Sequence, residues 1–246
     1  MSPRTVGPAQ VVAETALTGL TVPLRQSGVL LGRDRAGVPV VAPLFGPRPV
    51  TIVFIGGWWA AQVLVHRCLG HGATVLVDAV DTNAPAQNHT MAGLAHWLAL
   101  DRTVAAPPAS GARSGPASPG IGRVRPMAGE ASPAWPATAT QPLLRVHDVG
   151  PAGPGGRPLM HAWQTQLTAL ARLTAESLQL LGAADLVLVQ RLEALEAGLV
   201  GSALLLGPDV VARITALDNE TVVALRGPSV RYAWLTPTAL ERQAFG

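Results

Sequence analysis

The residues with the clearest chemical potential are two glycines that follow an apolar run. Val50–Ile55 is rich in β-branched and aromatic side chains, Gly56 and Gly57 follow it, and a helical segment begins at about Trp58. A strand, a glycine turn and a helix in this order usually frame a phosphate-binding loop, where backbone N–H groups cradle the phosphates and a Lys ammonium reaches them. All 18 basic residues of this chain are Arg, and none is Lys. The sequence therefore predicts the frame of a phosphate site without its cation.

The residues after the turn also lack the chemistry of hydrolysis. Gln62 and Val63 stand about where an ATP-hydrolysing loop carries its Lys and its magnesium-binding hydroxyl. One interpretation is a βα turn plugged by the aromatic side chains of Trp58 and Trp59. The other is a dinucleotide turn, in which Asp78 would be the acid that binds a ribose, although Trp58 is bulky where the pyrophosphate should approach.

A second acid completes the candidate nucleotide site. Leu143–Asp148 reads as a strand ending in a carboxylate, where an ATPase would hold Mg²⁺. Without the Lys and the hydroxyl, Asp148 can equally be a strand-end cap or the partner of an Arg. His147 and His161 match no familiar metal-ligand spacing, and no Gly-x-Ser-x-Gly elbow occurs, so no metal, cofactor or catalytic residue is predicted. The candidate nucleotide-binding residues are Gly56, Gly57, Asp78 and Asp148.

Two further side-chain types invite a functional interpretation. Trp58 and Trp59, in tandem at a helix start, could form a docking surface, because aromatic anchors are enriched at interface hot spots. Cys68, the single cysteine, lies in an apolar helical stretch. A small core residue is the structural interpretation, and a lone thiol nucleophile is the alternative.

These residues require a βαβ frame to position them. Gly28–Gly32 and Val38–Val41 around a turn predict a β-hairpin, with Pro39 confining its strand to an edge. The central strand and the helix to Leu69 are followed by a buried strand over 73–77, which predicts a βαβ unit with a right-handed crossover. Short β candidates before the hairpin are Val11–Val12 and Leu20–Val22.

Later segments complete an α/β domain over 1–246, as a three-layer sandwich with a mostly parallel central sheet of the P-loop or Rossmann type. A short helix is expected over 90–100, and the Pro- and Ala-rich segment 103–142 is expected to be a disordered insert. One helix is expected over 193–206, with an apolar stripe through Leu195, Leu199 and Leu206. Further expected elements are strands over 143–148, 166–170, 185–190, 221–225 and 230–235, a helix from Thr174 to Gly182, and a capping box of Thr238 with Glu241.

Composition restricts the class of protein. The chain is 48% hydrophobic and 13% charged, but its longest apolar run, 50–65, is interrupted and shorter than the roughly 20 residues of a membrane-spanning helix. With no signal-peptide pattern at the start, a cytoplasmic location without a transmembrane segment is expected. The net charge is +3 and the arginines are dispersed, so no nucleic-acid partner is expected. Abundant Ala, Gly, Pro and Arg without Lys are typical of a GC-rich genome such as that of an actinobacterium.

The order of these features resembles a known family. Three segments resemble the hairpin and the phosphate-loop entry of FtsK/HerA-type P-loop ATPases: residues 29–40, Pro43-Leu44 and the strand that leads into the glycine turn. This family includes the motor of type VII secretion. Asp148 falls where that family carries its second acidic motif, and 185–191 through Thr238 resembles the elements that close such a domain. The general character of the sequence also resembles that of small actinobacterial proteins encoded at type VII secretion loci.

With Gln62 and Val63 in place of the reactive residues, the resemblance implies a degenerate, non-hydrolysing relative. It would act as a structural or docking component of a secretion or translocation ATPase, its protein partner, and could reach the inner face of the cell membrane through that partner. The alternative is a Rossmann-like enzyme that binds a nucleotide or nucleotide-sugar at the Gly56-Gly57 turn.

Overall fold

The computed structural model describes residues 28–80, 90–104, 123–127, 136–154 and 161–245. The β candidates at Val11–Val12 and Leu20–Val22, and most of the Pro- and Ala-rich segment, lie outside these ranges. Within them no helix combines the length and the hydropathy that crossing a membrane requires.

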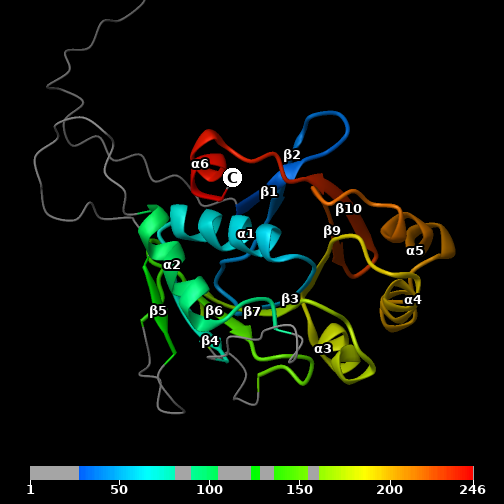
Figure 1. Cartoon of the computed structure of the whole chain (residues 1–246), viewed down its shortest axis with the longest axis horizontal. Coiled ribbons are helices and arrows are strands. Elements are labelled where there is room, and N and C mark those ends of the chain that lie inside the picture. The colour runs from blue at the N-terminus through cyan, green and yellow to red at the C-terminus, as the bar shows by residue number, and fades with distance from the viewer. Residues whose placement is uncertain (1–27, 81–89, 105–122, 128–135, 155–160, 246) are drawn as a thin grey trace, which may run out of the picture.

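The described residues form an α/β fold around one mixed, mostly parallel sheet, as the sequence predicted (Figure 1). Its strand order is β2-β1-β10-β9-β8-β3-β7-β6-β4-β5. The six strands from β8 to β5 are mutually parallel, whereas β9, β10, β1 and β2 pair antiparallel with their neighbours. The strands are β1 Val29–Arg33, β2 Pro39–Ala42, β3 Val50–Ile55, β4 Thr74–Ala79, β5 Val124–Pro126, β6 Leu143–Asp148, β7 Gln164–Leu170, β8 Leu186–Val189, β9 Thr221–Arg226 and β10 Ser229–Trp234.

Strand β3 is the central strand that the apolar run predicted. It pairs in parallel with β7 on one side and with β8 on the other, and its residues from Ile52 to Ile55 are buried. A strand covered on both faces has no solvent side to make polar, which explains why its sequence shows no alternation.

Helices cover both faces of this sheet and make three layers (Figure 1). One hydrophobic cluster joins α1 and α2 to the sheet and receives Phe245 of α6, and a second joins α3, α4 and α5 to the opposite face. The helices are α1 Trp58–Gly70, α2 Leu94–Val104, α3 Leu178–Ala183 preceded by a 3-10 turn at Ala175–Ser177, α4 Ala194–Ala203, α5 Pro208–Thr215 and α6 Ala239–Phe245.

The side chain of Arg67 ties the hairpin to α1 and α6. Its guanidinium donates to Glu241 Oε1 at 2.6 Å, to the carbonyls of Leu31 at 2.7 Å and Leu30 at 3.1 Å, and to the carbonyl of Thr236 at 3.0 Å. Both charged side chains are buried. Thr238 and Glu241 also form the predicted capping box of α6.

Cys68 has the structural role rather than the reactive one. Its side chain is fully buried in the first cluster, and burial raises the pKa of the Cys68 thiol to about 12. A thiol of that pKa is almost entirely protonated at neutral pH and is a poor nucleophile.

The two strands of the predicted βαβ unit are not neighbours in the sheet. Strands β3 and β4 are parallel, but β7 and β6 lie between them. The helix after β4 begins at Leu94 rather than at about Thr90, because Asp148 accepts hydrogen bonds from the backbone of Met91 and Ala92 and holds that turn outside the helix.

Two other expectations need correction. The helix expected over 193–206 is α4, which ends at Ala203, and Leu195 of its expected apolar stripe is 85% exposed. Helix α5, which was not expected, begins with Pro208 in its first turn, a position that favours proline. Within 103–142, expected to lack structure, Val124–Pro126 forms β5, which pairs in parallel with β4, and the backbone N–H of Val124 donates a hydrogen bond to the Asp101 carboxylate.

Candidate functional site

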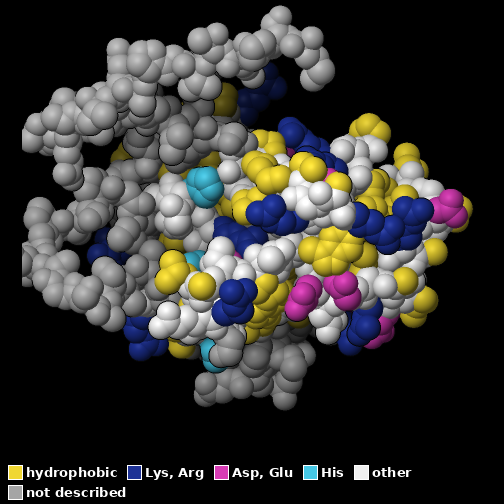
Figure 2. All heavy atoms as spheres, turned by 90° about the horizontal axis from the view of Figure 1, so that it is seen from above, with side chains coloured by type: hydrophobic (Ala, Val, Ile, Leu, Met, Phe, Trp, Pro, Cys, Tyr) yellow, Lys and Arg dark blue, Asp and Glu magenta, His cyan; other side chains and the backbone are white. Residues whose placement is uncertain are grey.

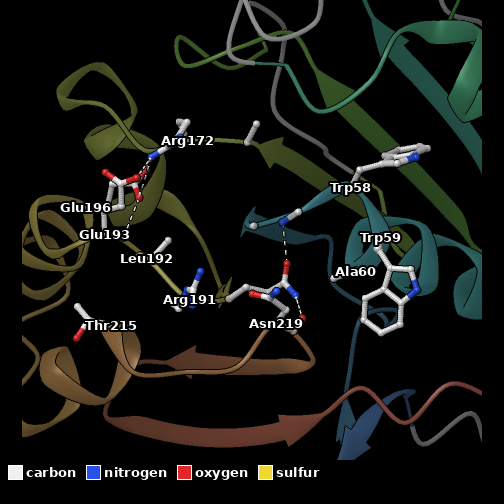
Figure 3. Close-up of a pocket in the computed structure, with 14 residues that line it drawn as sticks. Trp58, Trp59, Ala60, Arg172, Arg191, Leu192, Glu193, Glu196, Thr215 and Asn219 are labelled. Carbon is white, nitrogen blue, oxygen red and sulfur yellow. Dashed lines mark hydrogen bonds and ion pairs between the residues drawn. The ribbon is translucent and has the colours of Figure 1, made fainter.

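A cavity of about 720 Å³ opens at the carboxyl ends of β3, β7 and β8 (Figure 3). It contains the Gly56-Gly57 turn and the start of α1 on one side and the start of α4 on the other. Its lining residues are Gly56 to Ala60, Ala171, Arg172, Gln190 to Glu193, Glu196, Thr215 and Asn219.

The place of this cavity in the fold is the one at which α/β sheets usually bind ligands. Helix α1 leaves β3 toward one face of the sheet, whereas the helices that follow β7 and β8 cover the other face. Connections that diverge in this way leave a crevice at the carboxyl ends of the strands. The fold therefore supplies a ligand-sized space beside the glycine turn.

The amide that would begin a phosphate cradle already has a partner. Gly57 donates its backbone N–H to the side-chain Oε1 of Gln190 at 2.7 Å, and Nε2 of the same carboxamide donates to the carbonyl of Asn219 at 2.6 Å (Figure 3). A Cβ at Gly56 would lie 2.5 Å from that Oε1, so the glycine permits the close approach. Gln190 thus occupies with its own oxygen the position where an anion would meet this turn.

The charges around the cavity balance. Arg172 donates to Glu193 at 2.6 Å and lies 3.9 Å from Glu196, and the only other charged lining residue among those described is Arg191. Two arginines and two glutamates give no net positive field for a triphosphate, whose binding in an active loop relies on Lys and Mg²⁺.

Trp58 and Trp59 occupy different environments. The Trp58 ring packs edge-on against Trp97, with centroids 4.5 Å apart, and against His96 at 6.4 Å. Figure 3 shows the Trp58 indole directed away from the cavity and the Trp59 indole on its right-hand wall. Both indoles are half-buried.

Asp148 serves the fold of the neighbouring turn. The residue is fully buried, and its two oxygens accept hydrogen bonds from Met91 N at 2.7 Å, Ala92 N at 2.8 Å and Trp97 Nε1 at 2.9 Å. Burial raises the pKa of Asp148 against these hydrogen bonds, which act to lower it. The carboxylate is therefore engaged as a cap, the structural role considered from the sequence, and no oxygen faces the cavity at Gly57.

Asp78 lies far from the turn that it would serve in a dinucleotide site. It contacts His147 Nδ1 at 3.0 Å, and burial lowers the pKa of His147 despite this contact. Because two strands separate β4 from β3, Asp78 is offset from the turn by three strand spacings, about 14 Å. The sheet order thus does not bring Gly57 and Asp78 together.

Gln190 was not among the residues proposed from the sequence. The available signal was a polar amide directly after the buried strand Leu186–Val189, which is the edge at which ligands meet parallel sheets. Its partner Gly57 is 133 positions away, so the contact has no local signature. Among the described residues, no group of three or more His, Cys, Asp or Glu side chains could hold a metal ion.

Comparison with known proteins gives structural neighbours only. No family model and no curated protein matches the chain. The genome packaging NTPase B204 from Sulfolobus turreted icosahedral virus 2 in complex with AMP is 10% identical, with a TM-score of 0.43, over 77% of this chain and 98% of that one. Its complex with AMPPCP is 9% identical, with a TM-score of 0.45, over 75% of this chain and 97% of that one. B204, the DNA-packaging ATPase from Sulfolobus turreted icosahedral virus, is 9% identical, with a TM-score of 0.44, over 77% of this chain and 98% of that one.

Proposed function

We propose that this protein is a non-catalytic α/β module that acts as a structural or docking component of a secretion or translocation ATPase machinery. The observation that carries the proposal is the contact between Gln190 Oε1 and Gly57 N at 2.7 Å. The phosphate cradle is filled from within by a neutral side chain, and the residues that would drive hydrolysis are missing from the helix that follows.

The surroundings support the same interpretation. Gln62 and Val63 leave α1 without the ammonium and hydroxyl of an active loop. Asp148 is committed to three hydrogen bonds inside the fold. The link to an ATPase partner rests on the resemblance of the hairpin and the β3 entry to FtsK/HerA-type domains, and both elements are present in the structure as β1, β2 and β3.

A nucleotide titration tests the non-catalytic part. We expect no change in the unfolding temperature of the protein with ATP, ADP, NAD or UDP-glucose, each with and without Mg²⁺. A ligand held at 100 times its Kd would stabilise the fold by about 2.7 kcal/mol, which such a measurement detects. ATP hydrolysis that is abolished by Gly57→Val would contradict the proposal.

The alternative of a nucleotide-binding enzyme has one observation in its favour, the position of the cavity at the switch between the two helical layers. The variant Gln190→Ala separates the two functions. If the carboxamide merely fills an unused cradle, removing it leaves nucleotide affinity undetectable. A wild-type protein that binds NAD or a nucleotide-sugar, and loses that affinity on Gly56→Val, would establish the alternative.

The docking part is tested with a motor domain of the FtsK/HerA type from the same genome. We expect a complex on size-exclusion chromatography with light scattering that persists without nucleotide, since this chain would contribute architecture and no turnover. Failure to bind any such motor domain would leave the module without its proposed partner class and would overturn this part of the proposal.

A further inference from the structure

A second cavity, of about 740 Å³, lies on the other side of the loop that follows α5. Three parts of the chain enclose it: the turn of the β1–β2 hairpin, the end of α5 and strand β10. Its lining residues are Asp34 to Ala36, Arg213, Ala216 to Asp218, Thr221, Val230 to Tyr232 and Trp234. None of them belongs to the glycine turn.

The floor of this cavity is an edge of strand β10 that is largely unpaired in the part of the chain that the structure describes. Strand β10 pairs with β9 along its length, from Ser229 opposite Arg226 to Trp234 opposite Thr221. On its other side the only described pairing is that of Trp234 with Arg33 of β1. Among the described residues, β10 therefore has a single strand neighbour from Ser229 to Ala233.

The register of the β9–β10 hairpin shows which backbone groups face that edge. Arg226 and Ser229 flank a two-residue turn, so they form the closing hydrogen-bonded pair, and alternate residues follow the same pattern. The N–H and C=O groups of Val230 and Tyr232 consequently point away from β9. An added strand would find four backbone hydrogen-bonding groups there, the arrangement that peptide-binding domains use for strand addition.

The side chains beside this edge combine apolar surface with positive charge. Val230, Tyr232 and Trp234 are half-buried and share one face of β10, because they are two residues apart. All three line the cavity. The Tyr232 hydroxyl oxygen is buried and has no hydrogen-bond partner among the described residues. A buried hydroxyl without a partner is costly for the fold.

The charges of the residues that line the cavity indicate which kind of ligand it would attract. Arg35, Arg213 and Arg231 are exposed, and their guanidinium groups make no hydrogen bond or ion pair with the described residues. Figure 2 shows arginine side chains next to hydrophobic ones on this upper face, toward the side where Figure 1 places α5 and β10.

The two acids of the cavity are already engaged. Asp34 accepts from the N–H groups of Ala36 and Val38, and Asp218 accepts from Thr221 Oγ1 at 2.6 Å and from Glu220 N. The hydrogen bond from the Thr221 hydroxyl lowers the pKa of Asp218 and keeps it ionised. Three free guanidinium groups beside two engaged carboxylates leave a net attraction for acidic side chains.

We propose that the β10 edge and the cavity beside it bind an extended, acidic peptide segment of a partner protein by strand addition. The segment pairs its backbone with Val230 and Tyr232, places an apolar side chain over the Tyr232 and Trp234 rings, and sets its carboxylates against the three arginines. This inference rests on the proposed docking role and gives it a location and a partner chemistry.

The test uses the full chain, ¹⁵N-labelled, and a synthetic peptide of about eight residues in which pairs of Val alternate with pairs of Glu, so that each face of the extended peptide carries both side-chain types. We expect shifts of the amide signals that are largest at Val230 and Tyr232 and that shrink with added salt. Two matched peptides serve as controls: one with Lys for each Glu, and one with N-methyl groups on alternate backbone nitrogens. Neither should shift these signals, because one has the wrong charge and the other cannot pair as a strand.

Substitutions in the protein separate the charge from the strand edge. Arg213→Glu should weaken the acidic peptide by about fivefold or more, as expected for reversing one charge at a binding surface. Arg48→Glu makes the same charge change at an exposed site outside the cavity and should leave affinity unchanged.

Three results would overturn the inference: binding of the Lys peptide as tight as that of the Glu peptide, equal effects of the two arginine substitutions, or no shift at the β10 edge at millimolar peptide. The nucleotide titration is independent of all of them. If the protein binds a nucleotide but not the peptide, both the proposed non-catalytic role and this docking site are wrong. If it binds neither, the non-catalytic role is retained and only this docking site is wrong.

Discussion

The side-chain carboxamide of Gln190 accepts the backbone N–H of Gly57 at 2.7 Å and donates to the Asn219 carbonyl at 2.6 Å. One neutral side chain thereby joins the glycine turn after β3 to the loop before β9. This contact makes the turn part of the packed structure, and its energetics can be measured.

Replacing Gln190 by Ala should destabilise the protein by about 1–3 kcal/mol, because a part-buried N–H and a part-buried carbonyl each lose their partner. Urea unfolding followed by tryptophan fluorescence measures the change. Gln62→Ala, on the helix that follows the turn and without a hydrogen bond to the turn among the described residues, should cost well under about 1 kcal/mol. Equal losses for the two variants would show that the carboxamide contributes nothing specific.

The two glycines of the turn should respond differently to a methyl group. A Cβ at Gly56 would meet Gln190 Oε1 at 2.5 Å and Phe54 Cζ at 2.9 Å, whereas one at Gly57 has its nearest neighbour at 3.5 Å. We expect Gly56→Ala to cost about 1–3 kcal/mol through overpacking and Gly57→Ala less than about 1 kcal/mol. Adding Gln190→Ala to Gly56→Ala should recover part of that loss, and purely additive free energies of unfolding would refute the steric explanation.

Removal of the Asp148 carboxylate should be among the most destabilising single changes. Asp148→Ala leaves three donors, two backbone N–H groups and the Trp97 indole, without an acceptor in a buried place. The expected loss is about 3–5 kcal/mol, measured by thermal unfolding. Addition of Mg²⁺ to the wild type should leave its unfolding temperature unchanged, and a stabilisation lost in Asp148→Asn would instead point to a metal ligand.

The buried Arg67–Glu241 pair predicts a pH dependence of stability. Burial alone would raise the pKa of Glu241, but the hydrogen bonds from Arg67 and Thr238 and the charge of Arg67 outweigh it and lower the pKa below 4.5. The folded state therefore binds fewer protons than the unfolded state, so this contribution is present above pH 4.5 and is lost as the pH falls through the lowered pKa. Glu241→Gln should flatten the acid limb of the stability curve and cost about 3–5 kcal/mol at pH 7. An unchanged acid limb would rule out this origin.

The Cys68 thiol should be inert in the native protein. It is fully buried with a pKa raised to about 12, so a thiol reagent at pH 8 should label it only at the rate of unfolding. Labelling that is complete within seconds without denaturant would restore the nucleophile interpretation.

The sequence predicted the elements whose signals are local. Val50–Ile55 shows no polar alternation, and its residues from Ile52 to Ile55 are buried. Thr238 and Glu241 have the spacing of a capping box, and the box forms. These features depend on neighbours within one turn or one strand. Their prediction needed no knowledge of the sheet order.

The features that the sequence did not reveal are long-range or depend on a boundary. Gln190 and Gly57 meet because β8 pairs with β3, which no local pattern encodes. Leu205, at φ +53, turns the chain between α4 and α5, and α5 itself was not among the elements predicted from the sequence. Val124–Pro126 is too short to show alternation, and only its pairing with β4 makes it a strand.

The guanidinium of Arg67, on α1, donates hydrogen bonds to carbonyls of the first hairpin and to the carboxylate of Glu241, which lies 174 positions further along the chain. A hairpin held in this way cannot be locked in place while the chain is still being synthesised, since its clamp is completed only when Glu241 has left the ribosome. Strands β1 and β2 therefore gain this clamp only after the strands from β3 to β10 have been synthesised, and deleting the segment that carries Glu241 would loosen their attachment to α1.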